Sequence, residues 1–224
     1  MEIQPLETVI AELASDDWLE AGCAIKKLIP HGEAAIAALP IVFELTLHDK
    51  APVRSDSRAI IKRLGKLAVP FLRDKAADES PHHRAMAIAL LTETGCRWAS
   101  SCRLAEQILD DRCDELPDWG TNPEEIIRLF KTALDDGSLE VRFNAACALE
   151  EFGRHIPETI PVFIEVLQNG TPHQQNCAAL HLGRIGHPAA AAADELTMAA
   201  TQCRYAALAA SNALRRIGPA ENAS

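Results

Sequence analysis

One sequence pattern occurs twice in this chain, 33 residues apart. Each copy combines a short polar turn, an alanine-rich stretch and a closing glycine: DDGSLEVRFNAACALEEFG at 135–153 and QNGTPHQQNCAALHLGRIG at 168–186. The closing glycines are Gly153 and Gly186, and small or apolar residues occupy matching positions inside both copies. Self-similarity at a period of this length indicates a fold built from stacked supersecondary units.

Weaker copies of the pattern cover most of the chain. They are SDDWLEAGCAIKKLIPHG at 15–32, DKAPVRSDSRAIIKRLG at 49–65, DESPHHRAMAIALLTETG at 78–95 and CRYAALAASNALRRIG at 203–218. Successive closing glycines stand 30–33 residues apart, or 58 residues apart where one copy is missing. Arg54, Arg84 and Arg142 each stand eleven residues before a closing glycine. Each unit of such a repeat needs its neighbours to bury its apolar face.

Each repeat also has a second half, which follows the closing glycine. The clearest examples are LPIVFELTLHD at 39–49, VPFLRDKAAD at 69–78 and IPVFIEVLQN at 160–169. Pro40, Pro70 and Pro161 stand at matching positions, and proline is favoured at the start of a helix because its missing N–H needs no partner there. The preceding glycine suits the left-handed residue that ends a helix. We therefore expect each repeat to form helix, tight turn, helix.

The predicted fold is all-α: an α-solenoid, or superhelix, of stacked antiparallel helix pairs. We expect a single domain over residues 1–224. Its expected parts are a cap helix at about 5–14, repeats at about 15–110, an acidic loop at 111–122, repeats at about 123–218 and a frayed tail at 219–224. The composition agrees, because 48% hydrophobic but only 4% aromatic residues suit closely packed helices better than strands.

The copy at Asp136–Gly153 carries the fullest signature: Asp, then Val-Arg, then Ala-Ala-x-x-Leu, then an apolar residue before the glycine. This signature resembles the HEAT repeat, and most closely the short HEAT-like repeats of the phycobilisome-lyase type. In that family the aspartate of the turn and the arginine of the next helix form a ladder between repeats. The resemblance assigns this role to the pairs Asp49/Arg54, Asp78/Arg84 and Asp136/Arg142. Gln175 replaces the arginine in the copy at 168–186, so we expect a weaker ladder there.

The seven cysteines are odd in number and contain no Cys-x-x-Cys, so they predict neither a disulfide framework nor a zinc cage. Cys147 and Cys177 lie in alanine-rich stretches, where we expect them to pack as small apolar residues. The N-terminal stretch lacks the basic and apolar regions of a signal peptide, and no apolar run reaches 18 residues. These features together predict a cytoplasmic protein with no membrane segment.

The net charge of −10 is unevenly distributed. Residues 106–125 hold eight acidic residues and one basic residue, and residues 111–122 stand where the repeat predicts a helix. One interpretation is a neutral insertion; the other is a partner-binding loop carried by a rigid scaffold. The candidate partner-binding residues are Asp110, Asp111, Asp114, Glu115, Asp118 and Trp119. Trp119 suits an interface anchor, but it could equally tuck into the groove between repeats.

A basic segment lies earlier in the chain, where residues 50–75 hold eight basic and two acidic residues. Arg54, Arg58, Lys62 and Lys66 are spaced by four, which places them along one flank of the expected helix. We call these four residues the basic stripe. It is either a solvated flank, with Arg54 in the ladder, or a site for an anion or the acidic surface of a partner.

Residue patterns of catalysis are absent from the sequence. It has no phosphate-binding Gly-rich loop, no Gly-x-Ser-x-Gly, no His-Glu-x-x-His and no His-Glu dipeptide. We therefore assign no catalytic residue, no cofactor and no metal, and we expect a protein that leans away from enzymatic activity. The acidic balance and scarce aromatic residues also make a nucleic-acid partner a poor fit.

The predicted function is a protein–protein interaction module that binds a protein partner through its concave face and through the acidic loop. One version is an immunity-type or inhibitor protein for a basic target. The alternative is a phycobilin lyase subunit, which the family resemblance implies, and a nucleic-acid-associated HEAT-like protein ranks below it. The residues that carry the resemblance are structural, so they speak to fold and not to activity. The oligomeric state does not follow from the sequence.

Overall fold

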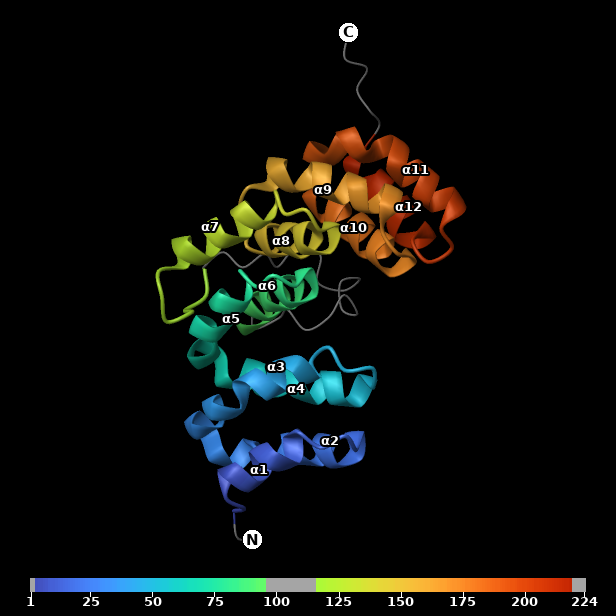
Figure 1. The fold of residues 1–224 in the computed structure, drawn as a ribbon. Coiled ribbons are helices and arrows are strands. Elements are labelled where there is room, and N and C mark those ends of the chain that lie inside the picture. Colours follow the sequence, from blue (N-terminus) through green and yellow to red (C-terminus); the bar gives the residue numbers. More distant parts are fainter. Residues whose placement is uncertain (1–2, 96–115, 219–224) are drawn as a thin grey trace. The chain divides into compact units, whose positions relative to one another are not determined.

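The computed structural model describes residues 3–95 and 116–218 (Figure 1). These residues form helices, turns and irregular segments, with no strand among them, and the all-α prediction is confirmed. The chain divides into two compact units: unit 1 comprises residues 1–98 with 117–122, and unit 2 comprises residues 99–116 with 123–224. Whether both units join into one continuous solenoid stays a prediction.

Unit 1 consists of short helices that pair along the chain. They are α1 (Leu6–Leu13), α2 (Trp18–Lys27), the 3-10 segment η1 (Ile29–Ala38), α3 (Leu39–Leu45), α4 (Ala51–Leu64), the 3-10 segment η2 (Gly65–Ala68), α5 (Val69–Lys75) and α6 (Pro81–Gly95). Helix α4 packs against α2 and α6. Helix α3 packs against α4, and helix α5 packs against α6. The first helices α2, α4 and α6 therefore form one row, and the second helices α3 and α5 flank it.

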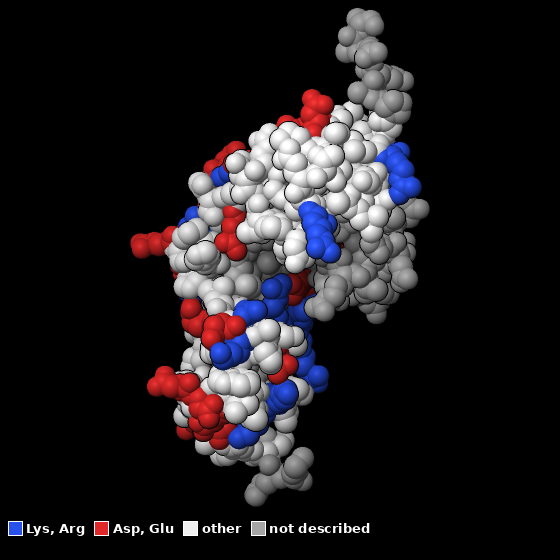
Figure 2. All heavy atoms as spheres, turned by 90° about the vertical axis from the view of Figure 1, so that its right-hand side faces the viewer, with Lys and Arg blue, Asp and Glu red and all other residues white. Residues whose placement is uncertain are grey.

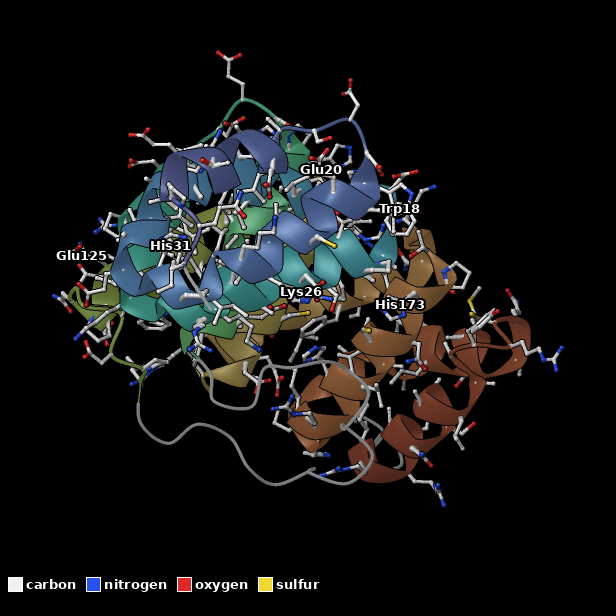
Figure 3. The ribbon with its side chains drawn as sticks, turned by 90° about the horizontal axis from the view of Figure 1, so that it is seen from below. Trp18, Glu20, Lys26, His31, Glu125 and His173 are labelled. Carbon is white, nitrogen blue, oxygen red and sulfur yellow. The ribbon has the colours of Figure 1, made fainter. Side chains whose placement is uncertain are left out.

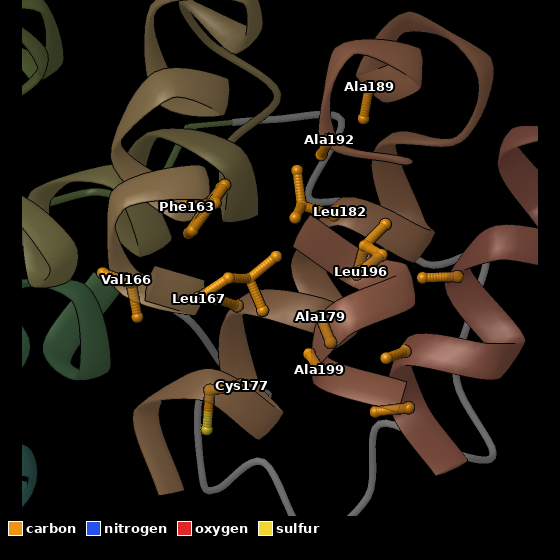
Figure 4. Packing of buried hydrophobic residues seen from close by; sticks show 14 of the residues in the cluster. Phe163, Val166, Leu167, Cys177, Ala179, Leu182, Ala189, Ala192, Leu196 and Ala199 are labelled. Atoms are coloured by element: carbon orange, nitrogen blue, oxygen red, sulfur yellow. The ribbon is translucent and has the colours of Figure 1, made fainter. Parts of the chain in front are cut away.

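Unit 2 repeats this arrangement with longer second helices. Its helices are α7 (Pro123–Ala133), α8 (Leu139–Glu151), α9 (Ile156–Asn169), α10 (Pro172–Ile185), the 3-10 segment η3 (His187–Ala192), α11 (Ala193–Gln202) and α12 (Ala207–Ile217). The first helices are α8, α10 and α12, and the second helices are α7, α9 and α11. Figure 4 shows the core between them, where Phe163 and Leu167 of α9 lie near Leu182 of α10 and Leu196 of α11.

Small residues set how closely the first helices of unit 2 approach each other. A side chain on Gly183 of α10 would meet the Cα and Cβ atoms of Ala213 on α12 at 3.2 and 3.3 Å. Ala178, Ala179 and Ala210 are fully buried in the same core. The alanine-rich signature is thus a packing signature, because small side chains let the helix backbones come close.

The closing glycines adopt a backbone conformation that other residues avoid. Gly32, Gly65, Gly153, Gly186 and Gly218 all have positive φ. The expected left-handed helical conformation is only half right, however, because ψ is −129° at Gly65 and −140° at Gly186. A positive φ with such a ψ lies in the region that is open to glycine and strained for residues with a Cβ.

The proline prediction holds for two of its three positions. Pro40 and Pro70 lie in the first turn of α3 and α5. Pro161 lies inside α9, which begins five residues earlier at Ile156 and has Pro157 in its first turn. Pro161 is exposed, so water can reach the backbone group that it leaves without a helical partner.

Among the described residues, no single helix is long and apolar enough to cross a membrane. Only the helix Trp18–Lys27 taken together with Ile29–Leu45 would qualify, and these two segments meet at a bend of 115°.

Candidate partner-binding surfaces

The ladder arginines bind the main chain of the turns between repeats. Nη1 of Arg54 donates to the carbonyl oxygens of His48 and Asp49 at 2.7 and 2.8 Å. Nη1 of Arg84 contacts the carbonyls of Asp78 and Glu79 in the same way, and Nη1 of Arg142 contacts that of Asp136. Each arginine therefore ties the start of a first helix to carbonyl oxygens at the end of the preceding repeat.

The aspartates of these turns have a different role. Oδ1 of Asp78 accepts from the backbone N–H of Ser80 at 2.9 Å, and Oδ1 of Asp136 accepts from that of Ser138 at 2.8 Å. The Ser80 N–H, followed by the ammonium group of Lys75 and by His83, holds the pKa of Asp78 well below its ordinary value. These aspartates thus shape the turn that the arginine then holds.

Gln175 takes over part of the arginine's role in the copy at 168–186. Its Nε2 donates to the carbonyl oxygen of Leu167 at 2.9 Å. A neutral amide replaces a charged guanidinium, and hydrogen bonds that involve a charged group are the stronger kind. At this position one hydrogen bond between neutral groups therefore joins α10 to the end of α9.

The basic stripe is paired with groups of unit 1 along most of its length. Arg54 binds the turn carbonyls, and Arg58 forms an ion pair with Glu93 of α6. Lys66 Nζ lies 3.6 Å from a carboxylate oxygen of Asp118. Figure 2 agrees: on the face that it presents, Lys and Arg side chains gather over unit 1 together with Asp and Glu. These contacts favour the interpretation of the basic stripe as a solvated flank. The interpretation as an anion site stays a prediction, and within the stripe it would depend mainly on Lys62.

Asp110, Asp111, Asp114 and Glu115 lie outside the described residues, and residues 117–122 belong to unit 1. Asp118 is exposed, and the Gly120 N–H followed by Lys66 lowers its pKa. Trp119 is only 1% exposed, and its indole Nε1 donates to the carbonyl oxygen of Leu91 at 3.0 Å. An anchor buried in its own protein is not available to a partner, so Trp119 follows the second interpretation and tucks into unit 1.

A surface that the sequence did not single out is the row of second helices in unit 2. Helices α7, α9 and α11 hold six acidic and two basic residues, a net charge of −4. The first helices α8, α10 and α12 hold three acidic and four basic residues, a net charge of +1. The charge of unit 2 is therefore segregated between its two rows.

Side chains also link neighbouring second helices. Lys131 of α7 lies 3.6 Å from Glu158 of α9, and Gln168 of α9 donates to Glu195 of α11 at 3.0 Å. Hydrogen bonds from its own backbone and from His155 lower the pKa of Glu158, so this carboxylate stays charged at neutral pH. These contacts link α7 to α9 and α9 to α11.

A buried polar cluster between α8 and α10 also escaped the sequence analysis. Oε2 of the fully buried Glu150 lies 2.7 Å from Nδ1 of His181 and 3.5 Å from Nη1 of Arg184. Arg184 also binds Glu151 at 2.9 Å, and the Phe163 ring stacks on the imidazole with ring centroids 5.1 Å apart. The 33-residue shift gives the missing signal, because it aligns residue 181 with residue 148, beside Cys147 and Glu150.

The described cysteines, Cys23, Cys147, Cys177 and Cys203, are free thiols. Cys177 is buried in the core as predicted. Cys147 differs from that prediction, because it is only half-buried and its thiol hydrogen-bonds to His181. Among the residues that the structure describes, no group of three or more His, Cys, Asp or Glu is placed to hold a metal ion.

Comparisons with known proteins support the repeat architecture. Residues 122–220 match the family model for HEAT repeats. A designed armadillo repeat protein in complex with the peptide (KR)4 is similar in structure, with a TM-score of 0.50 at 16% identity over 96% of this chain and 100% of that chain. A second designed armadillo repeat protein has a TM-score of 0.48 at 17% identity, with the same coverage. No curated protein matches this chain.

The complex of CpcE and CpcF of phycocyanin lyase from Nostoc sp. PCC7120 is also similar, at 18% identity over 97% of this chain and 99% of that chain. Its TM-score of 0.34 is too low to support an argument about function. The match over residues 122–220 and the glycine-closed helix pairs of both units both agree with a HEAT-like repeat architecture.

Proposed function

We propose that this chain is a non-enzymatic scaffold that binds a basic protein partner on the second helices of unit 2. The observation that carries the proposal is the segregation of charge: −4 on α7, α9 and α11 against +1 on α8, α10 and α12. The second helices bury fewer residues than the first helices, so more of their charged side chains can face a partner. An acidic row attracts a basic surface and speeds its association.

The fold is suited to this role, because stacked helix pairs present an extended surface on regular elements. A designed armadillo repeat protein of similar fold was solved with the basic peptide (KR)4. That likeness concerns the fold alone, so the case for this chain rests on its own charges. A specific version of the proposal is an inhibitor or immunity-type protein that covers a basic target, with the acidic segment 106–125 as a further source of negative charge.

Three variants that each remove four negative charges test the proposal against a partner purified from the native host. The second-helix variant carries Glu124→Gln, Glu158→Gln, Asp194→Asn and Glu195→Gln. The loop variant carries Asp111→Asn, Asp114→Asn, Glu115→Gln and Asp118→Asn. The control variant in unit 1 carries Glu7→Gln, Asp16→Asn, Glu20→Gln and Glu33→Gln.

We expect the second-helix variant to bind the partner severalfold more weakly, mainly through a slower association rate that also falls with added salt. The control variant should bind as the wild type does, although its net charge changes by the same amount. A matching loss in the loop variant would add residues 111–118 to the interface. Equal affinity of the wild type and the second-helix variant would refute the proposed surface.

A further inference from the structure

The polar cluster of unit 2 contains a nucleophile that the scaffold function does not use. Cys147 and Glu150 are separated by one turn of α8, so both face α10. His181 of α10 lies between them: its Nδ1 contacts Glu150 at 2.7 Å, and the imidazole also hydrogen-bonds to the Cys147 thiol. Cysteine, histidine and carboxylate thus form one cluster between α8 and α10.

The ring of His181 is held in place from three directions. Glu150 is fully buried and binds one edge, Phe163 stacks on the face at an interplanar angle of 3°, and Arg184 binds Glu151 and Glu150 behind it. A histidine that is fixed by a carboxylate and directed at a thiol is the arrangement that activates cysteine nucleophiles.

The electrostatics of the cluster agree with this geometry. Burial alone would lower the pKa of His181, but Cys147 and Glu150 outweigh it and raise that pKa well above its ordinary value. Cys147 also contributes to the raised pKa of Arg184, so the guanidinium lies within electrostatic reach of the thiol. Glu150 and Glu151 of α8 balance His181 and Arg184 of α10 in charge. Reactive cysteines are found in such partly exposed surroundings with nearby cations.

We propose that Cys147 is an oxidation site for hydrogen peroxide, with His181 as the group that supplies the proton. The thiolate Sγ attacks one peroxide oxygen, the O–O bond breaks and an S–O bond forms. The sulfur loses two electrons, the peroxide gains them, and the leaving hydroxide takes the proton of His181 to become water. The product is Cys147 sulfenic acid beside a neutral imidazole, and it is open to capture by a small thiol. Because Cys147 is half-buried, the site favours a reactant as small as peroxide.

The other cysteines of the chain provide internal standards. Cys203 is half-buried like Cys147, and Cys23 is exposed. Trypsin cleavage after Arg142 and Arg154 releases residues 143–154 with Cys147 as the single cysteine. The oxidation of each site can therefore be followed by mass spectrometry on the intact wild-type chain, with hydrogen peroxide as the oxidant and a dimedone-type probe to trap the sulfenic acid.

We expect Cys147 to react severalfold faster than Cys203 near pH 6. Contact with the His181 imidazolium favours the thiolate form of Cys147, and only part of this gain is lost to the weaker nucleophilicity of a stabilised thiolate. The advantage should shrink toward pH 9, where an ordinary thiol is ionised as well.

His181→Gln should reduce the rate at Cys147 to that of Cys203, whereas His173→Gln on the same helix should leave it unchanged. Circular dichroism establishes that both variants fold. If His181→Gln does not fold, the wild-type pH profile still decides, because it needs no substitution. Oxidation of Cys147 that is no faster than that of Cys203 near pH 6, or no oxidation at all, overturns the proposal.

Discussion

Trp119 offers the sharpest test of how the acidic segment is held. A fully buried tryptophan removes roughly 150–250 Å² from water, which corresponds to about 4–6 kcal/mol at about 25 cal/mol per Å². This is an upper limit, because unfolded chains are partly compact, and large-to-small substitutions of aromatic core residues cost about 3–5 kcal/mol. We therefore expect Trp119→Ala to lower the free energy of unfolding by about 3–5 kcal/mol.

Trp119→Phe separates the hydrogen bond from the burial. Phenylalanine keeps most of the apolar contact but removes the indole donor from the Leu91 carbonyl, which still accepts from Oγ1 of Thr94, so the expected cost is about 0.5–1.5 kcal/mol. Trp18→Phe is the matched control, since Trp18 is 36% exposed and lies at the start of α2 (Figure 3). Its expected cost is below about 0.5 kcal/mol, as for ordinary surface substitutions.

Urea unfolding followed by circular dichroism measures these free energies. Hydrogen exchange of peptides from α6 then localises the effect, because the indole contacts Leu91 in that helix. The reasoning fails if Trp119→Ala costs less than about 1 kcal/mol, the scale of a single neutral hydrogen bond. Loss of partner affinity with unchanged stability would instead return Trp119 to the role of an interface anchor.

Three further predictions concern the joints between helices. Gly65→Ala should destabilise unit 1 by about 1–3 kcal/mol in urea unfolding, because φ is +54° there, whereas Gly137→Ala, in a turn without positive φ, should cost less. Arg142→Ala should lower the free energy of unfolding by about 1–3 kcal/mol, because it removes a charged donor from the turn and from Glu165. Arg128→Ala on α7 should change it by less than about 0.5 kcal/mol. An equal cost for both variants would contradict the role of Arg142 in holding the turn. Asp78 has a lowered pKa in the folded state, so its charge stabilises the fold at neutral pH and this contribution is lost as the pH falls below about 4. The melting temperatures of the wild type and Asp78→Asn should therefore differ at neutral pH and converge in acid, and a constant difference would contradict the assignment.

Much of the helical architecture could be predicted from the sequence because each repeat has the same local requirements. The closing glycines mark backbone positions that exclude a Cβ, and the alanines mark close helix contacts; neither depends on distant parts of the chain. Pro161 was misplaced because a proline fits both the first turn and an exposed position inside a helix, and only the start at Ile156 distinguishes the two.

The candidate sites were harder to predict, because they depend on which residues meet across repeats. The pairing of Lys66 with Asp118 joins residues 52 positions apart, and no periodicity encodes it. The contact of Trp119 with Leu91 joins residues 28 positions apart, so the sequence left the burial of Trp119 as one of two alternatives. The cluster of Cys147, Glu150 and His181 could have been predicted from the sequence, because the repeat period places α8 beside α10.

The way in which the arginines hold the turns has a consequence for how this chain can vary. Every residue has a carbonyl oxygen. A guanidinium that hydrogen-bonds to the carbonyl of Asp136 or Glu79 therefore does not require a particular side chain at that position. Apart from the aspartates that shape the turn, the side chains at the joint between two repeats are therefore free to diverge. Insertions and new surface chemistry can accumulate at the turns while the register of the helices is kept. A scaffold of this type can acquire new specificities one turn at a time.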